Sequence, residues 1–243
     1  MAPALPSPAR QTATSLALFA ALLLAWGALH VLGVFFWRWT PATALLAPLV
    51  VLALTWLNVG LFIVAHDCMH GSFAPGRPAL NRWVGRLVLL VYAGFSFNKL
   101  RGKHFLHHQH PGSADDPDFH ADAPTRFWPW YLLFFRRYFG WREFGILAVL
   151  LWSYILILGA DPLHALLFWG VPAILSSVQL FFFGTYLPHR HEEGGFRDHH
   201  NARTNDYPWF LSLLTCFHFG YHHEHHARPH LPWWRLPSAR GPA

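Results

Sequence analysis

Long apolar stretches alternate with polar segments along the chain, and four of them approach or reach the length that crosses a lipid bilayer. A helix needs about 20 apolar residues to span a hydrocarbon core of ~30 Å. The four stretches are Ser15–Trp37, Ala42–Ala65, Phe144–Ala160 and Leu163–Leu187. The pattern predicts an all-α integral membrane protein with about four transmembrane helices.

Two further apolar segments are expected to lie in the interface rather than to cross. Trp83–Phe97 is short for a span and carries Arg86, so it predicts an interfacial or re-entrant helix. Phe127–Trp141 is typical of an amphipathic interfacial segment. A cleaved signal sequence is an alternative for the first stretch, because Arg10 precedes it. That stretch is longer than a typical signal core and three more follow, so we interpret it as a span.

The positive charges predict how the chain is oriented. With four crossings, residues 1–14, 66–143 and 188–243 share one side of the membrane. Of the 18 Lys and Arg residues, only Arg38 falls on the other side. By the positive-inside rule, both termini and the large loop are expected to be cytoplasmic.

These boundaries predict a cytoplasmic N-terminal tail at 1–14, one membrane domain at 15–237 and a C-terminal tail at 238–243. The composition agrees, since 53% of residues are hydrophobic and 12% are charged. A net charge of +6 could indicate nucleic acid, but lysine is scarce and the basic residues are scattered among apolar runs. We expect a lipid bilayer as partner and no nucleic acid. The two cysteines form no CxxC pair and imply no disulfide scaffold.

Nineteen histidines outnumber the lysines and arginines, and seventeen fall on the predicted cytoplasmic side. Three boxes stand out: "HDCMH" from His66, "HFLHH" from His104 and "HHEHH" from His222. The spacings i, i+3 and i+4 place histidines on one helix face. Adjacent helical residues point about 100° apart, so an HxxHH helix can offer ligands to two metals. Eight imidazoles exceed the four ligands of a structural zinc site and favour a dinuclear centre.

A further histidine, His189, directly follows the fourth span, at a depth comparable to His66. We therefore expect nine metal ligands: His66, His70, His104, His107, His108, His189, His222, His225 and His226. His110 lies three residues after His107, and His223 three residues before His226, so spacing alone does not exclude them.

Carboxylates lie within or near the boxes. Ligating histidines commonly donate their second ring N–H to a carboxylate, which fixes the ring orientation. The candidates for this supporting catalytic role are Asp67, Asp115, Asp116, Asp118 and Glu224. For the "DDPD" run, a solvated turn is the alternative.

The sequence in and around the boxes resembles a known group of enzymes. Three boxes of the HxxxH, HxxHH and HxxHH type resemble the membrane fatty-acid desaturase and hydroxylase superfamily. "HDCMHGSF", "HFLHHQHPGSADDPDFH", "FGTYLPHRH" and "FGYHHEHH" are similar, more narrowly, to bacterial β-carotene ketolases. "YLPH" is similar to an extra-histidine motif of related di-iron monooxygenases, which supports His189. The resemblance extends from about Thr14 to Pro237.

Imidazole suits several metals and does not select one. The identity of the metal and its chemistry are therefore what the resemblance implies. It implies two iron ions (Fe²⁺), O₂ as co-substrate and electrons from a reduced ferredoxin-type donor. The substrate would be an apolar carotenoid, oxidised at the 4-position of its β-ionone ring through an alcohol and a gem-diol to a ketone. Canthaxanthin or astaxanthin would be the products. The protein would lie in the bacterial inner membrane with its active site cytoplasmic.

Two other interpretations stay open. A carotenoid ring hydroxylase or a fatty-acyl desaturase would share the same boxes, and spacing does not separate them from a ketolase. A non-enzymatic metal-binding or heme-binding membrane protein is a different class. Transport favours ionisable residues within the spans, and the polar residues found there, His30 and Asn58, are poor candidates. The sequence identifies no substrate-contacting residue.

Overall fold

The structure, a computed structural model, describes residues 6–240, and within them the chain is helical, with a single β-bridge between Thr204 and Tyr221. Its elements are α1 (Pro8–Phe35), α2 (Pro41–His70), α3 (Pro78–Ala93), α4 (Phe97–Gln109), α5 (Phe127–Tyr138), α6 (Trp141–Leu156), α7 (Pro162–Ala165), η1 (Leu166–Gly170), α8 (Val171–Phe181), η2 (Phe182–Tyr186), α9 (Leu187–His189), α10 (Trp209–Cys216), α11 (His222–Ala227), η3 (Trp233–Arg235) and α12 (Leu236–Ala239).

Three helical segments are long and apolar enough to cross a membrane, which confirms a helical membrane protein. They are Pro8–Phe35, Pro41–His70 and Pro162–His189, the last built from α7 to α9 without a break. The first begins seven residues before the predicted Ser15, so part of the expected 1–14 tail is helical. Residues 1–5 of that tail, and 241–243 of the expected C-terminal tail, lie outside the described residues.

The fourth predicted span has a different form. Helix α6 ends at Leu156 and has 16 residues, which is short for a crossing. It reaches span length only together with α5, and the two helices meet at a 78° bend. The segment predicted as a separate interfacial helix is therefore α5, the first half of this bent pair. Residues 6–240 therefore contain three candidate spans, or four if the bent pair counts as one.

Local sequence signals explain where α2 begins and ends. Thr40 and Thr43 form a capping box, and Pro41 occupies the first helical turn, where a missing N–H costs little. The helix ends at Gly71, whose φ of 76° is the left-handed conformation that glycine adopts without strain. The helix therefore continues beyond the predicted Ala65 and carries the whole first histidine box.

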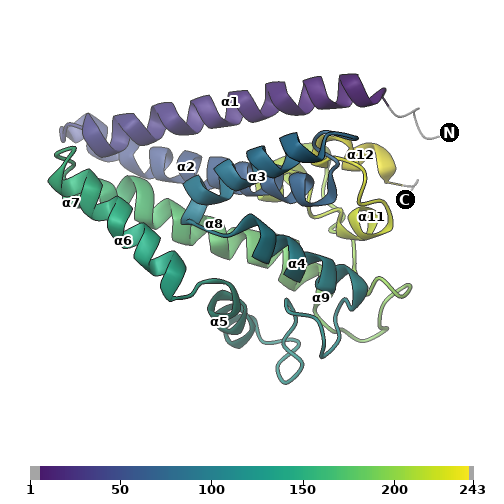
Figure 1. Ribbon diagram of the computed structural model, residues 1–243. Coiled ribbons are helices and arrows are strands. Elements are labelled where there is room, and N and C mark those ends of the chain that lie inside the picture. Colours follow the sequence, from purple (N-terminus) through teal and green to yellow (C-terminus); the bar gives the residue numbers. More distant parts are fainter. Residues whose placement is uncertain (1–5, 241–243) are drawn as a thin grey trace.

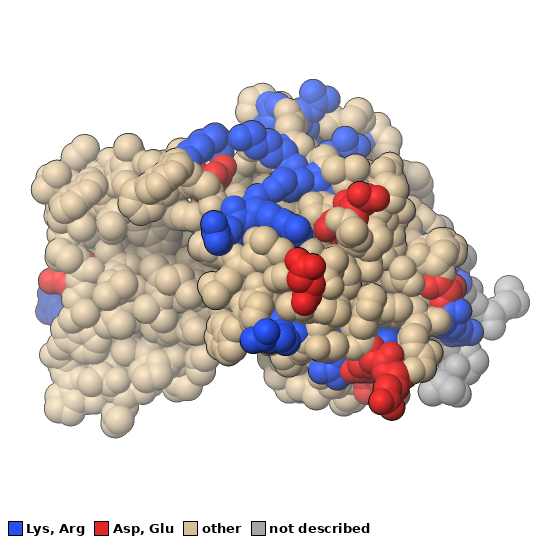
Figure 2. Space-filling model, turned by 90° about the horizontal axis from the view of Figure 1, so that it is seen from below, with Lys and Arg blue, Asp and Glu red and all other residues tan. Residues whose placement is uncertain are grey.

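The fold gathers the histidine-bearing segments at one end of the bundle. Figure 1 shows the end of α2 and the segments α4, α9 and α11 at the end where both chain termini lie. Figure 2 shows lysine and arginine side chains spread over one half of the molecule, while the other half is nearly uncharged. Large apolar side chains such as Leu24 and Leu45 are exposed on the spans, as expected for a surface that faces lipid.

Candidate metal centre

The structure brings the nine predicted histidines together in two groups. Five form one group: His66, His70, His104, His108 and His225. Four form the other: His107, His189, His222 and His226. Within each group, one ring nitrogen per residue lies within 4.8 Å of all the others. The alternatives His110 and His223 belong to neither group. His110 is exposed, and His223 Nε2 lies 2.8 Å from a carboxylate oxygen of Asp198.

Single helices supply both groups, as the adjacent pairs in the boxes predicted. Helix α4 gives His107 to the group of four and the neighbouring His108 to the group of five. In the same way, helix α11 gives His225 to the group of five and His226 to the group of four. The turn of about 100° between adjacent helical residues points each pair in two directions.

The Nε2 atoms converge as ligands around an ion do. His104 Nε2 lies 2.9 Å from His66 Nε2 and 2.6 Å from His70 Nε2. His226 Nε2 lies 3.2 Å from His107 Nε2 and 3.1 Å from His222 Nε2. One proton cannot bridge three nitrogens, whereas a metal ~2.1 Å from each nitrogen leaves neighbouring ligands about 3 Å apart. The two groups therefore fit two metal ions.

The neutral form, which metal ligation requires, is favoured for several of these imidazoles. Burial, followed by repulsion from neighbouring imidazoles, lowers the pKa of His104, His222 and His225 well below its usual value. The same causes lower the pKa of His108 to about 2. A neutral imidazole keeps the lone pair that a metal binds.

His189 is held in the orientation of a ligand. Its Nδ1–H donates to the backbone carbonyl of Asn201 at 2.7 Å, so its Nε2 keeps a lone pair. That Nε2 is buried and has no hydrogen-bond partner among the described residues. A buried polar atom without a partner is costly unless it binds something, which supports a metal at this position. The π-helical turn η2 directly precedes α9, and such turns are frequent at functional sites.

Asp116 orients His107 most directly. Its two carboxylate oxygens lie 2.9 and 3.0 Å from His107 Nδ1, and they also accept the backbone N–H groups of Gly112 and Asp118 at 2.8 Å. Burial alone would lower the pKa of His107, but the charge and hydrogen bond of Asp116, together with the charge of Asp118, raise it. Burial would raise the pKa of Asp116, but His107 and the backbone N–H groups of Asp118 and Gly112 together lower it.

The other four predicted carboxylates differ in their contacts. Asp118 lies 3.8 Å from His107 Nδ1, and burial raises its pKa to about 6. Asp67 lies 3.8 Å from His66 Nδ1 and accepts the Trp233 backbone N–H at 3.0 Å. Asp115 is exposed, and its carboxylate makes no hydrogen bond or ion pair within residues 6–240.

The hydrogen-bond partner of the Glu224 side chain is not one of the nine histidines. Glu224 accepts the hydroxyl of Thr204, which follows the loop residue Asn201 by three positions. Thr204 also forms the β-bridge with Tyr221, the residue before α11. Glu224 thus connects α11, which carries three of the nine histidines, to this loop.

Sequence reasoning missed several supporting groups. The carbonyl of Asn201 and the N–H of Trp233 belong to the backbone, and no residue pattern reports where a loop directs them. Tyr138, whose hydroxyl donates to Asp118, lies in a segment where aromatic residues were explained by the interface. Asp198, His199 and His200 form a third, mostly exposed group, which lies outside the three boxes.

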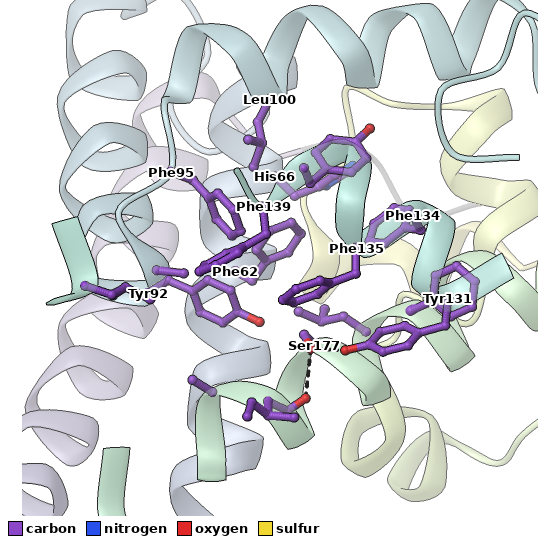
Figure 3. A pocket seen from close by; sticks show the side chains of 18 of the residues that line it. Phe62, His66, Tyr92, Phe95, Leu100, Tyr131, Phe134, Phe135, Phe139 and Ser177 are labelled. Atoms are coloured by element: carbon purple, nitrogen blue, oxygen red, sulfur yellow. Dashed lines mark hydrogen bonds between the residues drawn. The ribbon is translucent and has the colours of Figure 1, made fainter. Parts of the chain in front are cut away.

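One elongated cavity leads from the two histidine groups into the membrane-spanning part of the fold. It has a volume of about 560 Å³ and is lined at one end by His66, His104, His107 and His222. Its walls are apolar and aromatic; Figure 3 shows Phe95, Phe135 and Phe139 between His66 and Ser177. The lining follows one helical segment from Thr185 to Pro162, a distance of ~35 Å at 1.5 Å per residue. A long hydrocarbon would fit it.

The fold and the two histidine groups define a membrane metalloprotein, and comparison with known proteins identifies its class. The chain belongs to the fatty acid desaturase family, whose model matches residues 39–153 and 136–242. These two matches include all nine histidines of the two groups.

Individual relatives narrow the similarity. The chain is 52% identical over 239 residues to a β-carotene ketolase of Paracoccus sp. (strain PC1), covering 97% of this chain and 96% of the relative. It is 54% identical over 230 residues to the β-carotene ketolase of Paracoccus sp. (strain N81106 / MBIC 01143), covering 94% and 93%. A zeaxanthin 4-ketolase of Chlamydomonas reinhardtii is 37% identical over 245 residues, covering 96% of this chain and 54% of the relative.

Proposed function

We propose that this protein is a membrane oxygenase that converts the 4-position of the β-ionone ring of β-carotene to a ketone. The observation that carries this proposal is the apolar cavity that joins both histidine groups to the spanning helices. A carotenoid is long, rigid and apolar, and an aromatic-lined channel suits it. The near full-length similarity to β-carotene ketolases supports the same substrate class.

The nine histidines would hold two Fe²⁺ ions, five ligands on one and four on the other. Bound there, iron would supply the activation of O₂ with electrons from a reduced donor. The residues of this chain would orient the ligands and exclude water. Asp116 fixes the ring of His107, the Asn201 carbonyl fixes that of His189, and the apolar walls exclude water from the end of the cavity where the ring lies.

The overall reaction needs two oxidations of the same carbon. Each one inserts one oxygen atom into a C–H bond, consumes one O₂, two electrons and two protons, and releases one water. The first gives an alcohol and the second a gem-diol, which loses one further water to give the ketone. The gem-diol loses water without further oxidant, so four electrons per ketone must arrive from outside the chain.

An acidic, ferredoxin-type protein is the donor that we propose. Lys99 and Lys103 both lie on α4, the helix that carries the second histidine box, and Lys103 Nζ donates to the backbone carbonyl of Arg137. Such a surface attracts an acidic partner and also anionic lipid headgroups. With this face cytoplasmic in a bacterial inner membrane, as the positive charges predict, a soluble donor has access to it.

Expression in a host that makes β-carotene tests the function. We expect 4-keto carotenoids in extracts of the host with the wild-type chain, and none with the His107→Ala variant. A hydroxylated carotenoid as the sole product would instead identify a ring hydroxylase. Unchanged carotenoids, with the protein present in the membrane and loaded with metal, would contradict carotenoid oxidation altogether.

A further inference from the structure

Two hydrogen-bonding groups line the cavity beside the histidine groups: the carboxylate of Asp118 and the hydroxyl of Tyr138. Tyr138 donates its hydroxyl hydrogen to Asp118 Oδ1, and Asp118 Oδ2 lies 3.8 Å from His107 Nδ1. His107 lines the same cavity and extends its Nε2 into the group of four. The imidazole ring of His107 therefore separates this pair from the centre of the group of four, where the proposed reaction would occur.

Two other hydroxyl groups that line the cavity, those of Tyr131 and Tyr92, already have hydrogen-bond partners. The hydroxyl of Tyr131 is 2.7 Å from Ser177 Oγ, and that of Tyr92 is 3.0 Å from Ser176 Oγ. A carboxylate, in contrast, can accept about four hydrogen bonds. Within residues 6–240, the Tyr138 hydroxyl is the hydrogen-bond donor to the Asp118 side chain. Asp118 thus has acceptor capacity left over.

A hydrocarbon substrate gives this pair nothing to bind. β-Carotene has no donor or acceptor, and a polar group in an apolar cavity is costly without a partner. The reaction itself creates a partner, however. After the first oxidation, the ring carbon at the metal end of the cavity carries a hydroxyl group. This alcohol must stay in place, or return, for the second oxidation.

We propose that Asp118 and Tyr138 bind a hydroxyl group on the ring that faces the histidines. This inference rests on the proposed function. The ring hydroxyl donates to the Asp118 carboxylate, while Tyr138 holds that carboxylate in place. The alcohol is thereby retained until it becomes a ketone. A hydroxyl already present on the neighbouring ring carbon offers the same chemistry, and the experiment separates the two sources.

The product ratio is the readout. Tyr138→Phe and Asp118→Asn are compared with wild type in a β-carotene-producing host, with Tyr131→Phe as control, since it removes another hydroxyl deeper in the same cavity. We expect the ratio of 4-hydroxy to 4-keto carotenoid to rise by about tenfold in Tyr138→Phe and Asp118→Asn, given a lost hydrogen bond to a charged group. Tyr131→Phe leaves the ratio unchanged.

Purified enzyme distinguishes the source of the hydroxyl. We expect the KM of Tyr138→Phe to rise for the 4-hydroxy carotenoid and to stay unchanged for β-carotene. A rise for zeaxanthin as well would show that a hydroxyl on the neighbouring carbon is bound too. Iron content is measured in each variant, because a merely structural role near His107 would lower it without changing the product ratio.

An unchanged product ratio in a Tyr138→Phe variant with full iron content would overturn the inference. If Asp118→Asn loses iron, Tyr138→Phe still decides, because it keeps the carboxylate. A wild-type chain that produces no oxidised carotenoid would instead overturn the proposed function, and the inference with it.

Discussion

Individual side chains around the two histidine groups are held in place in different ways. His107 rests on the buried carboxylate of Asp116, whereas His189 rests on the backbone carbonyl of Asn201. Both contacts engage Nδ1 and leave Nε2 for the centre of the group. Such contacts raise ligand basicity and fix the ring, and they matter nearly as much as the ligands themselves.

Asp116→Asn should therefore weaken metal binding without removing a ligand. An amide provides one oxygen and no charge, so the orientation of His107 is lost in part. We expect metal affinity or activity to fall by about 10- to 100-fold, measured as metal bound per chain after dialysis against a chelator. Asp115→Asn is the matched control, since the adjacent carboxylate is exposed. Equal metal retention in the two variants would contradict the role of Asp116.

The gathering of these nine histidines was predictable from sequence, and most of the contacts that orient them were not. The i, i+3 and i+4 spacing of His104, His107 and His108 follows directly from helix geometry. The separation of Asp116 from its exposed neighbour Asp115 depends on how one turn folds, which no pattern records. Glu224 looked equivalent to Asp67 in sequence, yet it pairs with Thr204.

At the scale of elements, the turn between α10 and α11 fixes where the third histidine box lies. Phe217 sits in this turn, with a φ of 49°, and its ring is buried against α2. It stacks on Trp56 with a centroid distance of 4.5 Å and meets Trp233 at 5.2 Å. These contacts leave the ring little freedom to move.

Gly60 in α2 makes that packing possible, and replacing it tests the contact. A Cβ at this position would lie 2.5 Å from Phe217 Cζ. Because the ring cannot move aside, we expect Gly60→Ala to lower the free energy of unfolding by about 1–3 kcal/mol and to reduce bound metal. Unfolding is followed in one detergent for all variants.

Gly27→Ala is the control for the effect of helix propensity. Beyond the backbone of its own helical turn and its two chain neighbours, a Cβ at Gly27 would have no atom within 4 Å. Alanine there should leave stability unchanged or raise it by up to ~1 kcal/mol. If both variants unfold like wild type, the packing of Phe217 does not hold α11 in place.

Element boundaries were predicted well where hydrophobicity was continuous and poorly where it was not. The spans at α1, α2 and α7 to α9 follow the long apolar runs. Helix α6 was expected to run from Phe144 to Ala160, but it begins at Trp141 and ends at Leu156. Its pairing with α5 across a bend depends on tertiary contacts, which hydrophobic periodicity does not contain.

At the scale of the whole molecule, charge is concentrated on the half that holds the metal centre (Figure 2). The prediction from charge sorting was that all Lys and Arg except Arg38 share one side. Arg38 lies in the connection between α1 and α2, at the other end of these spans. The distribution favours an electron donor that approaches the charged half.

Reversing a positive charge on that half should therefore weaken the interaction with the electron donor, and reversing one on the other half should not. Lys99 is exposed on α4, and we expect Lys99→Glu to raise the KM for a reduced acidic donor several-fold at low salt. Arg38→Glu, the matched control, leaves it unchanged. The difference should shrink as ionic strength shortens the Debye length from ~30 Å at 0.01 M to ~8 Å at 0.15 M. A response independent of salt would exclude electrostatic steering.

The amount of iron bound to purified, active protein is the most direct test of the whole account. Two separate histidine groups predict two iron atoms per chain in the wild type and about one in His189→Ala, which removes a ligand from the group of four alone. His191→Ala, with an exposed histidine two residues away, should keep two. Full carotenoid oxidation by protein that holds no transition metal, or a single iron in both wild type and His189→Ala, would contradict it.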